Sequence, residues 1–414
     1  MDLLRFITAG SVDDGKSTLI GRLLHDSKSI LEDQLEAIRA ASIKRGSMEL
    51  DLALLTDGLR AEREQGITID VAYRYFTTPK RKFVIADFPG HLQYTRNMVT
   101  GASSADVAII LVDAVKGMTE QTRRHCLVAS LLRIPSLIVC VNKMDLVGYT
   151  RDAFEKILAE FSAFVGELEF PQITYIPISA LDGDNVVDLS ERMPWYEGPA
   201  LLKFLEEIEP PREPSRLPFR FPIQGVINAR SRDGDYRGYM GAISSGKLSV
   251  GDELVALPSG TLCRVQAIEL GGKPLPKKEA LAPLSVTIRL EEKIDLSRGD
   301  MLVGIHHPPQ ISGNLRAILC WMGSAPLDLT KKYALRQTTQ DILVKVSQIT
   351  CKIDINTLSR KTSNSPIQLN DIAEVELHLS KPIYYDRYTS DRATGSFILV
   401  DEYSNHSVAA GMIL

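Results

Sequence analysis

The chain has few cysteines and no long apolar run. These two features argue against a disulfide-stabilised protein and against a protein with membrane-spanning helices. Its five cysteines are an odd number among 414 residues and form no C-x-x-C pair, which argues against a disulfide framework or a zinc site. No stretch approaches the ~20 apolar residues of a membrane-spanning helix, and the apolar run at residues 3–8 is too short for a signal peptide. We therefore expect a reduced, cytoplasmic protein with no membrane partner.

An excess of one charge sign is also missing. The chain has 48 Lys and Arg against 52 Asp and Glu, a net charge of −4. This balance gives no overall attraction to nucleic acid, and we expect no nucleic-acid partner. The hydrophobic content of 44% is ordinary for a globular protein, and the length is sufficient for two or three domains.

The first 210 residues alternate apolar runs with helical patterns. The apolar runs are continuous, which is typical of strands that are covered on both faces. This alternation predicts an α/β domain with a doubly wound, mostly parallel sheet. The predicted strands cover 82–86, 107–112, 137–141 and 173–178, and the predicted helices cover 121–132 and 152–165.

Composition changes at a proline-rich linker, residues 209–214. Beyond it, helical periodicity largely disappears, and short strand patterns punctuated by Gly, Asp and Pro take its place, which predicts two β-barrels. The predicted strands here include 220–227, 238–244, 253–257 and 285–290. We expect a P-loop GTPase domain at 1–210, a β-barrel domain at 216–310 and a second β-barrel domain at 312–414.

A glycine-containing loop organises the first domain. It reads G-x-x-x-x-G-K-[ST] and lies between a strand-like run and a helical pattern. Its backbone amides and the following helix N-terminus suit phosphate groups. Lys16 is expected to reach the β- and γ-phosphates and Ser17 to bind Mg²⁺. The predicted phosphate-binding residues are Gly10, Ser11, Val12, Asp13, Asp14, Gly15, Lys16, Ser17 and Thr18.

Two more segments point to the metal and the γ-phosphate. A D-x-x-G motif begins at Asp87, just after an apolar run, and leaves the Gly90 N–H for the γ-phosphate. Thr68 lies in the Gly-Ile-Thr-Ile segment at 66–69 and can supply a second hydroxyl to the metal. Ligands of open α/β sheets bind at the carboxyl ends of the strands. The predicted Mg²⁺ ligands are Ser17, Thr68 and Asp87.

The base is identified by an N-K-x-D motif that follows the third apolar run. Asp145 can accept two hydrogen bonds from guanine, whereas adenine lacks this donor pair and would leave a buried carboxylate unpaired. Ala180 can offer its backbone N–H to guanine O6. These patterns predict GTP as the ligand, and the predicted base-binding residues are Asn142, Lys143, Asp145, Ser179, Ala180 and Leu181.

With these motifs, the chain resembles the translation-factor class of GTPases. That class typically has G-H-V-D-H-G-K-[ST] where this chain has G-S-V-D-D-G-K-S. This variant, together with residues 61–76, 94–98 and 408–413, resembles the large, GTP-hydrolysing subunit of the bacterial heterodimeric sulfate adenylyltransferase. Phe88 and Leu92 stand where that family usually has Thr and Glu, which puts the rate of hydrolysis in question.

The resemblance implies roles that the motifs alone do not give. His91 would orient the attacking water, with Lys16 and Thr68 as the other catalytic residues, and Val12 and Ile67 would form an apolar gate. A small catalytic subunit, a nucleotidyltransferase, would make adenosine 5′-phosphosulfate and pyrophosphate from ATP and sulfate. GTP hydrolysis would drive that sulfate assimilation step. An adenylylsulfate kinase, fused to related chains, is a second candidate partner.

Two other functions remain open at this point. One is a translation elongation or release-factor GTPase that delivers tRNA or a factor to the ribosome. The other is a regulatory GTP-binding switch without an enzymatic partner. Translation factors share the three-domain layout, so the fold does not distinguish these functions. Residues 11–14 and 61–76 favour the sulfate enzyme.

Overall fold

The structure is a computed structural model that falls into two compact units. One unit contains Met1–Pro211 and Asp354–Ser359, and the other contains Arg212–Ile353 and Arg360–Leu414. The predicted three-domain division stays a prediction. The described residues are 3–30, 32, 35–36, 39, 52, 72–88, 98, 101–102, 105–209, 214–231, 234–362 and 365–414.

A six-stranded sheet forms the centre of the first unit, with strand order β2-β3-β1-β4-β5-β6. All neighbouring strands run parallel except β2, which pairs antiparallel with β3 at one edge. The predicted mostly parallel sheet is therefore confirmed. The strands are β1 (Leu3–Ala9), β2 (Ala72–Thr77), β3 (Lys82–Asp87), β4 (Val107–Asp113), β5 (Ser136–Asn142) and β6 (Gln172–Pro177).

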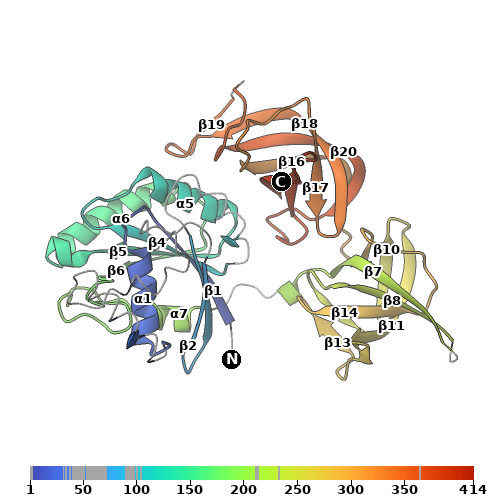
Figure 1. Cartoon of the computed structure of the whole chain (residues 1–414), viewed down its shortest axis with the longest axis horizontal. Coiled ribbons are helices and arrows are strands. Elements are labelled where there is room, and N and C mark those ends of the chain that lie inside the picture. Colours follow the sequence, from blue (N-terminus) through green and yellow to red (C-terminus); the bar gives the residue numbers. More distant parts are fainter. Residues whose placement is uncertain are drawn as a thin grey trace. The chain divides into compact units, whose positions relative to one another are not determined.

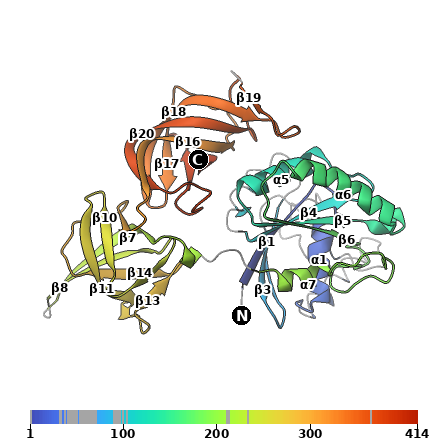
Figure 2. The same cartoon turned by 180° about the vertical axis from the view of Figure 1, so that it is seen from behind.

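Helices cover both faces of this sheet, as the doubly wound prediction requires. α1 and α7 lie on one face, and α5 and α6 on the other (Figures 1 and 2). α1 buries Leu19, Ile20 and Leu23 against the sheet, and each such side chain contributes roughly 1.5–3 kcal/mol. None of the helices in the described ranges has the length and apolar character that a bilayer crossing needs. The helices are α1 (Lys16–Asp26), α5 (Glu120–Leu131), α6 (Arg151–Val165), α7 (Leu201–Glu207) and the 3-10 turns η3 (Met144–Val147) and η4 (Pro214–Arg216).

Two β-barrels make up the second unit. In each, six strands close into a ring and one short strand adds to the edge, which confirms the predicted barrels. The first uses β7 (Arg220–Ser231), β8 (Gly234–Ala242), β10 (Glu253–Leu257), β11 (Thr261–Leu270), β12 (Lys273–Pro274), β14 (Ser285–Leu290) and β15 (Met301–Gly304), with β9 (Lys247–Ser249) and β13 (Glu279–Leu281) paired beside it. The second uses β16 (Gln310–Trp321), β17 (Lys332–Gln337), β18 (Gln340–Ile353), β19 (Arg360–Lys361), β20 (Ile372–Tyr385), β21 (Ser396–Val400) and β22 (Ser407–Ile413).

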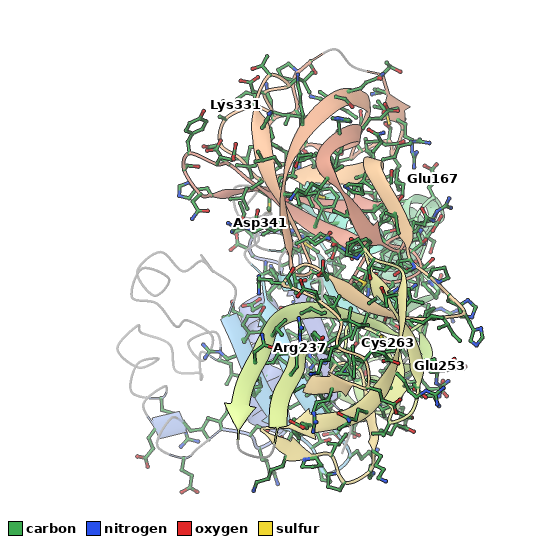
Figure 3. The ribbon with its side chains drawn as sticks, turned by 90° about the vertical axis from the view of Figure 1, so that its right-hand side faces the viewer. Glu167, Arg237, Glu253, Cys263, Lys331 and Asp341 are labelled. Atoms are coloured by element: carbon green, nitrogen blue, oxygen red, sulfur yellow. The ribbon has the colours of Figure 1, made fainter. Side chains whose placement is uncertain are left out.

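Alternation of buried and exposed side chains explains why these strands form barrels. On β10 and β11, Leu254 faces Cys263 inside the barrel, while the neighbouring pair of Glu253 and Arg264 is exposed. Figure 3 marks Glu253 and Cys263. All five cysteines are free and buried, so the predicted lack of disulfides is confirmed.

The two barrels are joined by a buried ion pair. Arg220 is 2% exposed, and its Nε and Nη2 donate to the two carboxylate oxygens of Asp386, each at 2.9 Å. Thr394 Oγ1 also donates to Asp386 Oδ2, at 2.8 Å. An apolar cluster adjoins this pair and also draws on both barrels: Leu257, Met301, Val303 and Tyr384.

Replacing Arg220 by Ala should destabilise the second unit, because it leaves a partly buried carboxylate without its countercharge. We expect a loss of about 3 kcal/mol in the free energy of unfolding. Trp321 is buried in the second barrel, and its fluorescence reports this unit alone once Trp195, the other of the two tryptophans, is changed to Phe. Arg264→Ala, which breaks the exposed pair with Glu253, should have little effect. Equal losses for the two variants would contradict the prediction.

In the first unit, α5 buries a histidine. The helix begins at Glu120 because Thr119 and Thr122 form a capping box, and its inner face then carries His125, which is 1% exposed. Burial lowers the pKa of His125 to about 3, and the charges of Lys16 and Arg124 add to this effect. Its Nδ1 has no hydrogen-bond partner among the described residues. The imidazole is therefore neutral in the folded protein.

This burial makes the stability of the first unit depend on pH. The unfolded chain takes up a proton at His125 below about pH 6.5 and the folded one does not, so stability falls as the pH falls. Between pH 7 and pH 5 the loss from this residue should be about 2 kcal/mol. Urea unfolding followed by Trp195, in a Trp321→Phe background, should show this loss in the parent and not in His125→Gln. His306→Gln, at an exposed loop position, is the control, and parallel pH profiles for parent and His125→Gln would refute the prediction.

Candidate nucleotide-binding site

The predicted phosphate loop connects β1 to α1 at the carboxyl edge of the sheet. Gly15 is the last residue before α1 and has a φ of +91°. A Cβ at this position would lie 2.4 Å from Asn142 Nδ2. Both the left-handed backbone and the close approach of Asn142 therefore require glycine.

Lys16 is held over this loop by the loop's own carbonyl groups. Its Nζ donates to Gly10 O at 3.1 Å and to Ser11 O at 2.7 Å. The side chain is 7% exposed, and burial lowers the pKa of its ammonium group, while the nearby carboxylates of Asp87, Asp14 and Asp13 oppose the shift. The cation is thus already in place where phosphate oxygens are expected.

Asp14 closes the loop on itself. Its carboxylate is 1% exposed, and Oδ2 accepts from the Ser11 N–H at 2.5 Å. Burial raises the pKa of Asp14, and the hydrogen bond from Ser11 opposes this. Ser11 and Asp14, the two positions at which this chain departs from the typical translation-factor loop, therefore contact each other directly.

The expected metal ligands within the described residues lie on adjacent elements. Ser17 is in the first turn of α1, and Asp87 ends β3 beside Thr8 of β1. Thr8 Oγ1 donates to Asp87 Oδ1 at 2.9 Å, which holds the carboxylate in place. A hydroxyl and a carboxylate are hard oxygen donors of the kind that Mg²⁺ prefers, so these residues fit that ion.

The predicted base-binding residues gather where β5 and β6 end. Asn142 Nδ2 donates to Asp14 O at 2.7 Å, and Asn142 Oδ1 accepts from the Ala180 N–H at 2.9 Å. Ser179 Oγ donates to Asp145 Oδ1 at 2.8 Å. The Ala180 N–H, expected on guanine O6, is thus already bonded to Asn142, and a base would have to share or replace that bond.

Lys143 and Leu181 flank the same place. Lys143 has a φ of +64°, and its Nζ lies 2.8 Å from Asp113 Oδ2 at the end of β4. Leu181 is 56% exposed although it is apolar. Asp113 was not among the predicted site residues. Its position directly after the apolar run at 107–112 could have indicated it from the sequence.

Several predicted residues lie outside the described ones. These are Thr68, Gly90 and His91, together with Ile67 of the expected gate and Leu92. Phe88, the other departure from the family pattern, is described and fully buried. A Cβ on Gly101 would lie 2.7 Å from the edge of the Phe88 ring, so the ring fills space that a glycine leaves open.

Two protein-family models match parts of the chain. The family model of the elongation factor Tu GTP binding domain matches residues 1–210, and that of the GTP-eEF1A C-terminal domain-like family matches residues 314–414. A solved structure of sup35 complexed with GMPPNP is 22% identical and aligns with 100% of this chain and 94% of its own, but its TM-score of 0.44 supports no conclusion.

Two relatives match over the whole chain. Sulfate adenylyltransferase subunit 1 of a Sulfurovum species is 49% identical over 421 residues, which covers 100% of this chain and 87% of that protein. The bifunctional enzyme CysN/CysC of Mycobacterium tuberculosis is 50% identical over 414 residues, which covers 100% of this chain and 67% of that protein. The chain therefore belongs to the family of sulfate adenylyltransferase subunit 1, whose GTP-binding domain is of the elongation factor Tu type.

Proposed function

We propose that this chain binds GTP with Mg²⁺, hydrolyses it, and so drives sulfate activation by a separate adenylyl-transferring subunit. The role in sulfate activation rests on one observation. The whole chain is near 50% identical to proteins named as subunit 1 of sulfate adenylyltransferase. This similarity decides against the translation-factor and regulatory-switch alternatives. The number in that name implies at least one other subunit, and the small catalytic subunit is our proposal for it, with an adenylylsulfate kinase as a further candidate partner.

At the phosphate end, the protein's task is to position groups and to stabilise negative charge. Lys16 and the amides of residues 10–18 would bind the phosphates, with Gly90 N–H on the γ-phosphate. Ser17, Thr68 and Asp87 would hold Mg²⁺, which when bound neutralises charge on the β- and γ-phosphates. His91 would orient the attacking water. The apolar gate of Val12 and Ile67 would keep the His91 side chain away from the γ-phosphate until the partner subunit binds.

At the base end, Asp145 would accept from guanine N1–H and the 2-amino group, and the Ala180 N–H would donate to O6. Ser179 supports this assignment, because its hydroxyl already holds one carboxylate oxygen of Asp145. Asn142 and Lys143 hold the surrounding loops, and Leu181 would cover a face of the base.

Coupling is needed because the product of sulfate activation is a high-energy phosphoric–sulfuric anhydride, which forms unfavourably. Hydrolysis in one subunit can favour that step in another only if the two subunits share linked conformational states. Loss of the γ-phosphate commonly changes the loops around it, and we assign this role to 56–76 and 87–98. We also propose a cytoplasmic location, which the five free, buried cysteines support.

The base assignment can be tested with Asp145→Asn. An amide can no longer accept two hydrogen bonds from guanine, so GTP affinity should fall at least about 100-fold, while xanthosine triphosphate, with an oxygen in place of the 2-amino group, should bind better than to the parent. Competition against a fluorescent nucleotide measures the dissociation constants of GTP and of xanthosine triphosphate. Asp152→Asn, on the exposed start of α6, is the control. Unchanged preference for GTP in Asp145→Asn would refute the assignment.

The coupled function can be tested by reconstitution with a candidate small subunit. Pyrophosphate release from ATP and sulfate should rise when GTP is added, and a non-hydrolysable GTP analogue should not reproduce the rise. His91→Ala should lower GTP turnover about 100-fold, with nucleotide affinity nearly unchanged, and should abolish the stimulation. His306→Ala should behave as the parent does. Lack of any GTP effect in the parent would overturn the sulfate function, and equal losses of turnover and affinity in His91→Ala would overturn its catalytic role.

A further inference from the structure

Helix α1 contacts the proposed base-binding loop through one arginine. Arg22 lies six residues after Lys16 on this helix. Its Nε donates to Ala180 O at 3.3 Å, and its Nη2 donates to Leu181 O. The side chain is 20% exposed; its bond to Ala180 O is partly buried, whereas its bond to Leu181 O is exposed. The guanidinium thus binds two consecutive carbonyl groups of the loop that would recognise guanine.

The peptide groups around Ala180 are held from both sides. The N–H of Ala180 donates to Asn142 Oδ1, while its carbonyl oxygen accepts from Arg22. The same loop is closed further along, because Gly183 N donates to Ser179 O at 2.8 Å. Asn142 holds the peptide group that precedes Ala180, and Arg22 holds the one that follows it. Rotation of the backbone at Ala180 is thus restricted from both ends, so the direction of the Ala180 N–H depends partly on Arg22.

The Arg22 side chain is itself fixed in place. Its Nη1 lies 3.7 Å from Asp26 Oδ1, one helical turn further on. A Cβ on Gly183 would lie 3.5 Å from Arg22 Cδ, so the loop packs closely on the aliphatic part of the side chain. The planar fork of arginine can serve two adjacent carbonyl oxygens at once, whereas the ammonium of lysine is a point charge without this geometry.

We propose that Arg22 is a positioning residue for guanine recognition, which fixes the Ala180–Leu181 peptide from the helix that begins at the phosphate loop. The base end and the phosphate end of the site then share one rigid element, since Lys16 and Arg22 belong to the same helix. This inference rests on the proposed contact between the Ala180 N–H and the 6-oxo group of the base.

The contact predicts a particular pattern of nucleotide affinities. Guanine and hypoxanthine both carry the 6-oxo group, whereas adenine carries a 6-amino group. Arg22→Ala should therefore weaken GTP and ITP by the same factor, about tenfold, and leave the weak binding of ATP unchanged. Asp145→Ala differs, because it should weaken GTP more than ITP, which lacks the 2-amino group.

Two more variants separate positioning from general stability. Arg22→Lys keeps the charge but not the fork, and it should also weaken GTP and ITP equally. Arg151→Ala, which removes an exposed arginine paired with Glu155 on α6, should leave all three affinities as in the parent. In saturating GTP, turnover by Arg22→Ala should stay within about twofold of the parent while its KM rises, because the phosphate contacts remain in place.

Competition against a fluorescent guanine nucleotide, with thermal unfolding of each variant, measures these effects. A lower melting temperature of Arg22→Ala with unchanged GTP and ITP affinity would overturn the proposal, since Arg22 would then be only structural. A larger loss for GTP than for ITP would also overturn it, because the effect would lie at Asp145. If the parent itself fails to bind GTP, the proposed function fails first, and that result is distinct from either of these.

Discussion

The nucleotide site depends on a single primary amide, that of Asn142. Its Nδ2 donates to the phosphate loop at Asp14 O, and its Oδ1 accepts from the Ala180 N–H in the loop that we propose binds the base. Only an amide side chain has both a donor and an acceptor in this arrangement, since a carboxylate cannot donate and an aliphatic chain can do neither. Asn142 is 2% exposed, so leaving either group unpaired would cost roughly 1–3 kcal/mol. The requirement for glycine at position 15 follows, because a side chain there would occupy the place of this amide.

That the described candidate residues lie close together could be predicted from sequence, because they follow strand ends and parallel strands bring their carboxyl ends to one edge. Sequence spacing gave Asn142 and Asp145 a role with the base, but it could not show that Asn142 joins two loops of the protein. Arg22 was missed for a similar reason. An arginine on an amphipathic helix usually faces water, and its partner at Ala180 is 158 residues away. Contacts of that kind depend on the register of the whole sheet, which short patterns do not contain.

The barrels show the same division between local and distant information. Short strand patterns between Gly, Asp and Pro predicted the strands, yet the first hairpin is longer than expected. The segment predicted at 220–227 continues to Ser231, and the one predicted at 238–244 begins at Gly234. The outer part of this hairpin carries mostly polar residues and has no apolar face, so its sequence pattern resembles that of a loop. Arg220 lies in an apolar strand and pairs with Asp386, 166 residues away. A buried ion pair adds little net stability over apolar packing, but it strongly penalises any arrangement that separates the charges, so it favours one docking of the two barrels.

The phosphate loop and its surroundings contain buried ionisable groups, and their burial costs stability. Three of these groups are the side chains of Lys16, Asp14 and His125. Burial shifts the pKa of each in the direction that favours its neutral form. Replacing Lys16 by an apolar group would remove its desolvation cost, so its presence is explained by what a cation does for a bound anion. A nucleoside triphosphate brings negative charge to Lys16, which favours the charged ammonium and offsets part of the cost. A ligand that binds only the folded state stabilises it by an amount that grows with its concentration. The stability of the folded loop therefore depends on whether a nucleoside triphosphate is bound.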